Sequence, residues 1–390
     1  MPACAPCCPS TPGVRDGDRR SITDWITGSI IAPGIIIACA LTLLFAPHVA
    51  SREKHGWAGE LVLALLMVAS LATTSGAVSF GATAATAFLI ALEALRVSRT
   101  ASLTLALSGL ALVVAAGAMA MGHPSIAFVA SIVSFGMRVG VFPLHSGIAG
   151  LTDRSLTLQL QQLATLPTSV FVHLRFVDHE VIASEWAPII VVIGTASTLA
   201  FALIALVQRT LHGLLRASVL MHGGMLFAAV GAAGQGHHAA ALLVAITLGL
   251  ALSGFGIMLA SLQARVGPLD ALKPGGRAQA FPRLAIGVAV FGGAGVGLPG
   301  TSGFVADDLL LHALWLTNVP SAVAMIVASA LLAVATLASF ARAFWGKPLR
   351  LLAPDLEGGE RLVLVVLVAW LVTLGFAPGL LVEPATALLR

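Results

Sequence analysis

The sequence predicts an all-α polytopic membrane protein with about 12 transmembrane helices. Hydrophobic residues make up 58% of the 390 residues, charged residues only 10%, and the mean hydropathy is +0.99. A soluble domain carries about 25% charged residues, so this composition excludes a water-soluble globular enzyme. It also excludes a disordered chain, which would be polar and poor in apolar residues. The apolar runs are continuous and do not alternate, which argues against a β-barrel.

Charged residues divide the apolar runs into twelve predicted helices, each close to the length needed to span a bilayer. Their ranges are 26–47, 58–76, 80–96, 102–121, 125–143, 157–174, 187–207, 216–234, 238–261, 284–310, 320–341 and 362–380. With this assignment, fifteen of the 21 Lys and Arg residues fall in alternate loops, five fall on the other side and Arg138 lies inside a helix. By the positive-inside rule, this split places the basic loops in the cytoplasm and both termini outside.

Four ionisable side chains lie inside predicted helices, where a charge is costly and therefore marks a candidate functional site. They are Glu93, Arg138, Asp307 and Asp308. Glu93 is either a titratable acid facing the bundle or an interfacial carboxylate paired with Arg96 or Arg99. Arg138 lies too deep to snorkel, and an ion pair with Glu93 would serve both structure and function. The two aspartates point about 100° apart on a helix, so at most one faces a given partner.

Two predicted helices contain residues that interrupt helical hydrogen bonding. The helix breaks are expected at Gly140 and Pro143, and again at Pro299 and Gly300. Interrupted helices in matching positions of two halves are a sequence signature of an ion path through an inverted repeat. The interrupted helices are the fifth and the tenth of the series. The odd offset of five predicts two inverted five-helix repeats, each with one broken helix.

Three histidines, His145, His173 and His222, lie in or beside apolar segments and titrate near neutral pH. Each is either a hydrogen-bonded helix contact or part of a proton relay with the buried acids. Nucleotide-binding loops and zinc-binding spacings are absent from the sequence. Cys4, Cys7 and Cys8 precede every apolar run; the C-x-x-C spacing could hold a metal or a redox pair, but we interpret the three as incidental thiols of a mobile tail. We therefore expect no metal and no cofactor bound by this chain.

Four segments in order resemble the antiporter-like proton-translocating subunits of complex I (NADH-quinone oxidoreductase), which are related to multisubunit cation/proton antiporters. FLIALEALRVS resembles the fifth helix of the family, and GMRVGVFPLHSG resembles its broken seventh helix. ALVQRTLHGLLRASVLMHGG resembles the link into the tenth helix, and GVGLPGTSGFVADDLL resembles the broken twelfth. The resemblance places Glu93 on the key glutamate of the family and Arg138 on its key lysine. Pro143 and His145 fall on a Pro and a His of the family, and Asp307 falls on a lysine or glutamate position. Three further residues match the family in the link into the tenth helix: Gln208, Ser218 and His222.

The sequence also departs from the family pattern. The lysine of the eighth family helix would fall near Pro167 or Thr168, and the lysine or histidine of the eleventh would fall near Thr247 to Ala251, so neither is present. Arginine is effectively always protonated, so Arg138 can bias its neighbours but does not readily pass a proton. The predicted helices would correspond to the third to fourteenth of the family.

Three functions remain open at this point. The resemblance implies a proton-translocating subunit of a complex I-like or antiporter-like assembly, located in the cell inner membrane. The same fold could serve an inorganic carbon uptake pump, or a scaffold subunit that conducts nothing. Expected partners are other membrane subunits, whose assembly would carry FMN and iron–sulfur clusters, or one large soluble zinc-containing subunit. Protons are the expected substrate, and no nucleic acid is expected.

The expected organisation places most of the chain in one transmembrane domain. Residues 1–24 are expected to form a flexible tail, and 25–57 a first transmembrane helix with a cytoplasmic loop. Residues 58–345 are expected to form the antiporter-like domain with its two inverted repeats. A final loop and transmembrane helix would occupy 346–390.

Overall fold

The computed structural model describes residues 16–50, 58–177, 181–234, 237–267, 275–347 and 354–389. Within these ranges the chain forms α-helices and no strand, which confirms the predicted all-α class. The helices are α1 (Asp16–Ala50), α2 (Ala58–Ala72), α3 (Gly76–Ala94), α4 (Arg99–Ala120), α5 (Pro124–Val139), α6 (Ser146–Arg154), α7 (Leu156–Phe176), α8 (Val181–Leu206), α9 (Leu211–Ala233), α10 (His238–Val266), α11 (Pro282–Ala294), α12 (Ser302–Thr317), α13 (Val319–Phe344), α14 (Gly358–Phe376) and α15 (Gly379–Leu389).

The predicted helical ranges all overlap helices of the structure, with differences at the ends. Helix α1 begins at Asp16, before the predicted start at 26, and α15 was not predicted. Eight helices in the described ranges are long and apolar enough to cross a membrane. The count of twelve spans and the inverted repeat therefore stay predictions. Cys4, Cys7 and Cys8 lie outside the described residues, as do residues 1–15 of the predicted tail.

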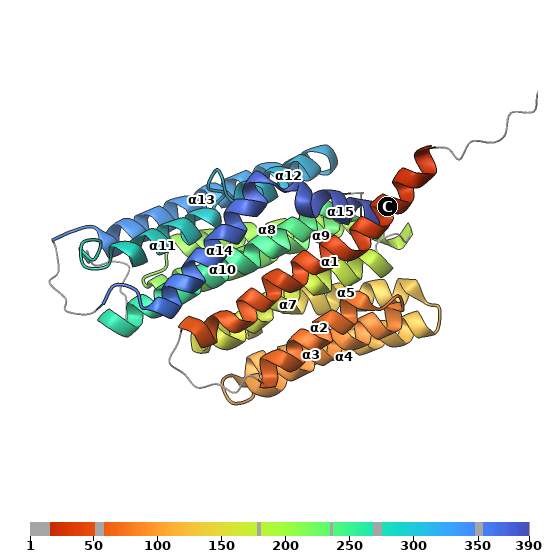
Figure 1. The fold of residues 1–390 in the computed structure, drawn as a ribbon, viewed down its shortest axis with the longest axis horizontal. Helices are drawn as coiled ribbons and strands as arrows, with labels where there is room; N and C mark the ends of the chain where they lie inside the picture. Colours follow the sequence, from red (N-terminus) through yellow and green to blue (C-terminus); the bar gives the residue numbers. More distant parts are fainter. Residues whose placement is uncertain are drawn as a thin grey trace, which may run out of the picture.

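The centre of the bundle is formed by α7, α9 and α10, whose residues are almost all buried. Figure 1 shows the helices running along the longest axis, with α2, α3 and α4 at one edge and α11, α12 and α13 at the other. The outer helices α4, α13 and α14 leave many large apolar side chains exposed, including Leu103, Leu110 and Val334. Such an apolar surface has no place in water and suits lipid.

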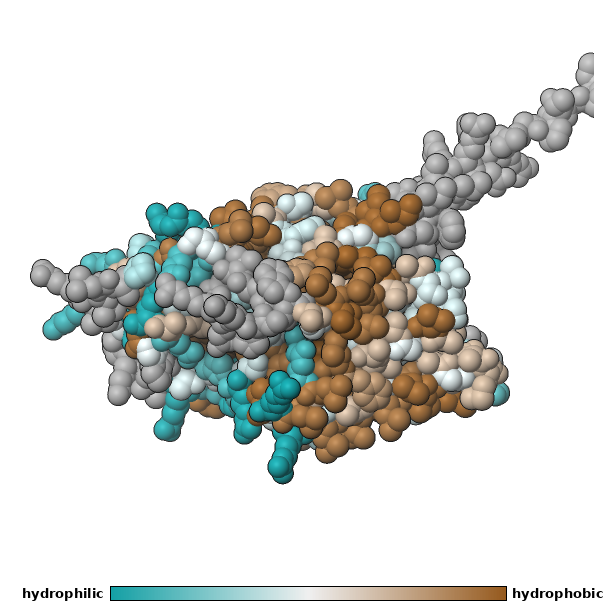
Figure 2. Space-filling model, turned by 60° about the horizontal axis from the view of Figure 1, so that its bottom comes forward, coloured by the Kyte–Doolittle hydropathy of each residue, from teal (hydrophilic) through white to brown (hydrophobic). Residues whose placement is uncertain are grey.

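Hydrophilic residues gather at the end of the bundle that lies opposite the C-terminus (Figures 1 and 2). Arginines on several helices are fixed there. Arg154 donates to the carbonyl of Val97, and Arg216 pairs with Asp153 at 2.6 Å. We call this the basic end. Its helix ends are those of the predicted cytoplasmic loops.

A buried ion pair joins α10 to α14 at the basic end. Arg265 donates to both carboxylate oxygens of Glu360, at 3.0 and 2.6 Å, and also to the carbonyls of Ser261 and Pro354. The two side chains are only 9% and 7% exposed. Glu360 in turn accepts the backbone N–H of Glu357, which completes a capping box at the start of α14. The pair therefore fixes both the place and the first turn of α14.

A glycine contact holds the first helix break against the centre of the bundle. A Cβ at Gly223 of α9 would lie 2.0 Å from the backbone carbonyl oxygen of Val139, the last residue of α5. Backbone cannot move aside as a flexible side chain can. Only glycine at position 223 therefore allows α9 to approach the end of α5 this closely.

We expect Gly223→Ala to destabilise the protein by about 1–3 kcal/mol, the usual range for overpacking. Thermal unfolding of the purified protein in detergent would measure the loss. The matched control is Gly117→Ala in α4, where a Cβ would meet nothing within 4 Å. There the added methyl group favours the helix, so the stability should stay equal or rise. Equal unfolding temperatures for the two variants would contradict the close contact.

Candidate functional site

The chain is interrupted between α5 and α6, where the sequence places the first helix break. Helix α5 ends at Val139, and Gly140 follows it in a left-handed conformation with φ of 72°. Pro143 lies in the connection, and α6 begins at Ser146. Gly140 provides the left-handed cap that L-residues rarely adopt. The break leaves Arg138 in the last turn of α5, inside the bundle.

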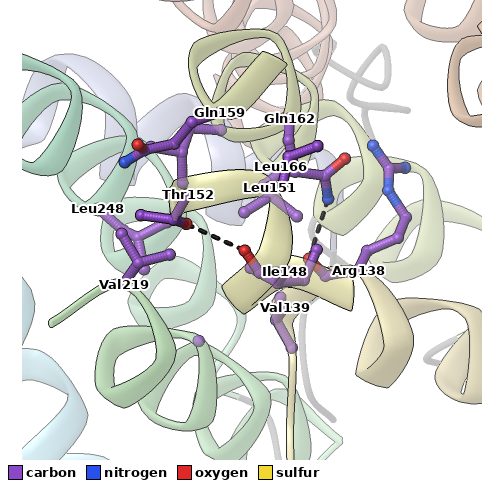
Figure 3. A pocket seen from close by; sticks show the side chains of 12 residues that line it. Arg138, Val139, Ile148, Leu151, Thr152, Gln159, Gln162, Leu166, Val219 and Leu248 are labelled. Carbon is purple, nitrogen blue, oxygen red and sulfur yellow. Dashed lines mark hydrogen bonds between the residues drawn. The ribbon is translucent and has the colours of Figure 1, made fainter. Parts of the chain in front are cut away.

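Arg138 is held by α7. The residue is 1% exposed, and its guanidinium donates to the hydroxyls of Ser169 and Thr165. Its backbone carbonyl accepts a 2.9 Å hydrogen bond from the side chain of Gln162. Figure 3 shows this bond and shows the guanidinium directed away from Val219 and Leu248. The structure therefore places this cation in the interior of the bundle.

The predicted ion pair between Glu93 and Arg138 is wrong. Glu93 accepts a 3.0 Å hydrogen bond from the amide of Gln161, and Arg138 binds hydroxyls further along α7. The physical reason is that α7 supplies polar partners to each group separately. Among the described residues, Glu93 also makes no ion pair with Arg96 or Arg99. Gly59 of α2 lies against the carboxylate, where a Cβ would come within 2.7 Å of Oε1.

A row of polar side chains follows one face of α7. It is made of Gln162, Thr165, Ser169 and His173, at spacings of three, four and four residues. Such spacing places side chains one above another on a helix. Near the end of the row, Nδ1 of His173 lies 2.8 Å from the hydroxyl of Ser131 on α5. The sequence reasoning singled out only His173 and missed the row, although its helical spacing within an apolar segment was a usable signal.

The polar face of α7 borders a cavity between α3, α4, α5 and α7. We call it the hydroxyl cavity. Its polar lining consists of Thr83, Ser131, Ser134, Arg138, Ser169 and His173. Apolar side chains, among them Phe80 and Phe135, complete the wall. Arg138 and His173 therefore share one enclosed polar space.

The chain is interrupted again between α11 and α12, where the sequence places the second helix break. Helix α11 ends at Ala294, and α12 begins at Ser302. Pro299 lies in the connection, where Gly297 and Gly300 have φ of 80° and 87°. The unwound stretch frees backbone carbonyls that must find partners inside the bundle. One of them, at Gly295, receives a histidine.

His222 of α9 lies between two backbone carbonyls. Its Nδ1 is 2.7 Å from the carbonyl of Ser218, one turn earlier, and its Nε2 is 2.5 Å from the carbonyl of Gly295. Carbonyl oxygens only accept hydrogen bonds, whereas neutral imidazole has a single N–H. Both contacts are therefore hydrogen bonds only when the ring carries two protons. The residue is 7% exposed.

Asp307 shares a cavity with His222. We call it the break cavity; it is lined by both side chains together with Thr247, Gly295, Ala306 and neighbouring apolar residues. The carboxylate of Asp307 lies beside Gly297, where a Cβ would come within 2.9 Å of Oδ2. Asp308 is exposed and does not line the break cavity. The expectation that only one aspartate can face a given partner is thus met by Asp307.

A further pocket lies beside Arg138, and its polar lining includes Thr152, Gln159 and Gln162. Its apolar lining includes Leu163 of α7 and the residues Leu166 of α7, Val219 of α9 and Leu248 of α10, which Figure 3 labels. Leu248 also lines the break cavity, so it stands between the two spaces. We call these four residues the apolar partition. Leu248 falls in the stretch Thr247 to Ala251, where the resembling family has an ionisable residue.

The remaining candidates lie apart from these cavities. His145 precedes α6 and contacts the rings of Phe142 and Phe201, with centroids at 5.6 and 5.3 Å. It lines neither the hydroxyl cavity nor the break cavity. In the described part of the chain, no three His, Cys, Asp or Glu side chains gather as a metal site would require.

The fold and the site define a multi-pass membrane protein in which two helices are broken inside the bundle and ionisable residues lie at both breaks. The sequence pattern of one family matches residues 56–333, and its description is NADH:quinone oxidoreductase/Mrp antiporter, transmembrane. The chain belongs to this family.

Curated relatives include respiratory subunits from two bacteria. NADH-quinone oxidoreductase subunit M of Escherichia coli K12 is 27% identical over 261 residues, covering 63% of this chain and 50% of the relative. Subunit N of Laribacter hongkongensis is 29% identical over 197 residues, covering 48% and 40%. The chain thus spans about half the length of the curated relatives it matches, or less.

Solved structures share the fold at low sequence identity. A chain of respiratory complex I from Thermus thermophilus with bound NADH matches with a TM-score of 0.82 and 20% identity, covering 92% of this chain and 84% of the other. A chain of the Mrp complex from Dietzia sp. DQ12-45-1b matches with a TM-score of 0.71 and 15% identity, covering 93% and 83%. Both neighbours are parts of multisubunit membrane complexes.

Proposed function

We propose that this chain is a proton-translocating membrane subunit of an assembly related to complex I or to the Mrp antiporter. The observation that carries the proposal is the break cavity, where a histidine and a carboxylate line the same space at an interrupted helix. Both groups exchange protons readily, and the interruption frees backbone for them to bind. The family membership supports the same function.

His222 couples proton binding to the position of the break. The doubly protonated ring donates to Ser218 and to Gly295, and so ties α9 to the connection between α11 and α12. Loss of one proton leaves a lone pair facing a carbonyl, which weakens one of these contacts. Asp307, on the wall of the same cavity, is the group that accepts the proton.

The first half of the bundle supplies a second set of polar groups. It leads from Glu93 and Gln161 near the basic end, along the polar row of α7, to His173 and Ser131. Arg138 stands within this set as a fixed positive charge that favours anionic neighbours. His145 remains a relay candidate outside both cavities, whereas Asp308 is exposed, does not line the break cavity and is left out of the proposed path.

The basic end is proposed to face the cytoplasm, with both termini outside, in the inner membrane. This orientation follows the positive-inside rule and agrees with the gathering of hydrophilic residues at that end (Figure 2). The domain limits of the sequence analysis, with an antiporter-like domain over 58–345, are retained as part of the proposal.

His222→Asn tests the coupling. Asparagine keeps a polar side chain of similar reach but cannot titrate. We expect proton flux into vesicles that contain the purified assembly to fall roughly 10²-fold or more, the scale of losing a positioned proton-transfer group. The control is His212→Asn at the basic end, where the ring contacts the carbonyl of Thr152. Flux at the wild-type level in His222→Asn would remove His222 from the path.

An inorganic carbon uptake pump is the second candidate function. The apolar partition favours it, because Leu248 lines both spaces and falls in the stretch Thr247 to Ala251, near which the resembling family has an ionisable residue. A chain that lacks this ionisable residue would use proton movement through one half of the bundle to drive another reaction. The partner would then be one large soluble zinc-containing subunit. The remaining alternative is a scaffold subunit that conducts nothing. In that case His222→Asn and the wild type would show the same proton flux.

Purification of the tagged chain from its own host in mild detergent would decide between the assemblies. Flavin and iron–sulfur absorption bands, with NADH-linked quinone reduction, would identify the complex I type and partners that carry FMN. A colourless complex with one large zinc protein would identify the carbon pump. A colourless set of other membrane subunits would identify the antiporter type.

A further inference from the structure

We propose that the hydroxyl cavity binds one monovalent anion of about the size of chloride, beside Arg138. The starting observation is a buried cation without a countercharge. Arg138 is 1% exposed, and within the described residues its guanidinium meets only the hydroxyls of Ser169 and Thr165. The inference stands on the hydroxyl cavity alone and does not depend on the proton path.

The partners of Arg138 are neutral and already engaged. The hydroxyl of Ser169 donates to the carbonyl of Thr165, and the hydroxyl of Thr165 donates to that of Gln162. Glu93, the acid expected to pair with Arg138, is held by Gln161 instead. A lone charge inside a protein costs several kcal/mol, whereas a close opposite charge recovers much of this cost. The site therefore favours uptake of an anion.

A carboxylate from another subunit cannot supply the charge. Arg138 is enclosed by α5, α7 and the α3–α4 pair, and a side chain from outside the chain has no surface of the guanidinium to reach. The countercharge has to be small enough to enter the bundle by itself.

The hydroxyl cavity contains hydrogen-bond donors that have no acceptor among the described residues. The hydroxyl of Ser134 lines it and is 1% exposed, and within the described residues neither this hydroxyl nor the Nε–H of Arg138 has a hydrogen-bond partner. Nε of arginine can only donate. The hydroxyls of Thr83 and Ser131 already donate to the carbonyls of Ser79 and Phe128. Unused donors beside a cation are the chemistry that recognises an anion.

The size of the space limits the ligand to a single small ion. The cavity has room for about one water-sized particle. Phe80, Leu112 and Phe135 close it on the apolar sides. A dehydrated halide is the anion nearest to this size, whereas a carboxylic acid or an organic phosphate is far too large.

Halide-dependent stability of the purified full-length chain tests the proposal. We expect its unfolding temperature to rise with sodium chloride and to saturate, compared with sodium gluconate at the same ionic strength, because a ligand that binds only the folded state stabilises it. Ser134→Ala keeps the positive charge and should weaken the apparent chloride affinity roughly tenfold. Ser253→Ala in α10, another buried hydroxyl without a partner but outside the cavity, is the control and should match the wild type.

Bromide provides a direct view of the site. In crystals grown with sodium bromide, we expect one anomalous peak within hydrogen-bond distance of Arg138 and Ser134, and none there in Arg138→Gln. A water molecule in that position at every halide concentration would overturn the proposal. So would chloride stabilisation that Ser134→Ala leaves intact, or a stability that chloride and gluconate affect equally. None of these readouts uses proton flux, so failure here is distinguishable from failure of the proposed function.

Discussion

Asp307→Asn is expected to abolish proton flux through vesicles that contain the purified assembly. Asparagine has the shape of aspartate but cannot bind or release a proton. The substituted side chain would still line the break cavity with His222, so the cavity would persist without its carboxylate. Losing a positioned acid–base group typically lowers a rate by about 10²- to 10⁴-fold. We expect the proton flux to fall by roughly 10⁴-fold or more. Acidification of the vesicle interior, followed with a pH-sensitive dye, measures it.

Asp308→Asn is the matched control for this variant. The two residues are adjacent and differ in where they point, because Asp308 is exposed and does not line the break cavity. We expect its flux to stay within about twofold of the wild type, since an exposed carboxylate makes only weak interactions. Loss of flux in Asp308→Asn with full activity in Asp307→Asn would reverse the assignment of the two acids.

The second large effect is expected on stability. Arg265→Ala should destabilise the folded protein by about 3–5 kcal/mol, because it leaves the carboxylate of Glu360 buried without its partner. The removed guanidinium makes four hydrogen bonds, two to Glu360 and two to backbone carbonyls. The loss would appear as a lower unfolding temperature in detergent and as early protease cleavage near α14.

Arg216→Ala is the corresponding control on the surface. Arg216 and Asp153 form a 2.6 Å ion pair at the same end of the bundle, but their side chains are 35% and 33% exposed. Exposed pairs of this kind contribute about 0–1 kcal/mol. A loss in Arg216→Ala as large as that in Arg265→Ala would show that burial does not set the strength of these pairs.

Much of the fold could be predicted because its signals are local. Apolar runs of spanning length give the helices, and Gly140 and Pro299 mark the two breaks in the positions where the structure has them. The start of α1 and the existence of α15 were missed. Both lie next to charged or proline-containing sequence, where hydropathy no longer distinguishes helix from loop.

The site was predictable residue by residue, but its pairings were not. Glu93, Arg138, His222 and Asp307 stand out because charge and imidazole are rare in apolar segments. Which of them meet depends on how α7 lies between α3 and α5, and this is a long-range property that spacing does not contain. The sequence analysis did not single out Gln161, yet this residue determines the partner of Glu93. Its amide binds Glu93, and Arg138 binds the hydroxyls of α7 instead.

The apolar partition has an electrical consequence. Leu248 lines both the pocket beside Arg138 and the break cavity, and neither Leu248 nor Leu163, Leu166 and Val219 can carry a proton. A membrane potential of 100 mV is worth about 2.3 kcal/mol for each charge that crosses. An unbroken row of polar groups between the two halves would let protons cross freely. The energy of the membrane potential would then be lost as heat even when the assembly is not working. If the chain conducts protons as proposed, the partition would act as an insulator, and conduction between the halves would require water to enter it first.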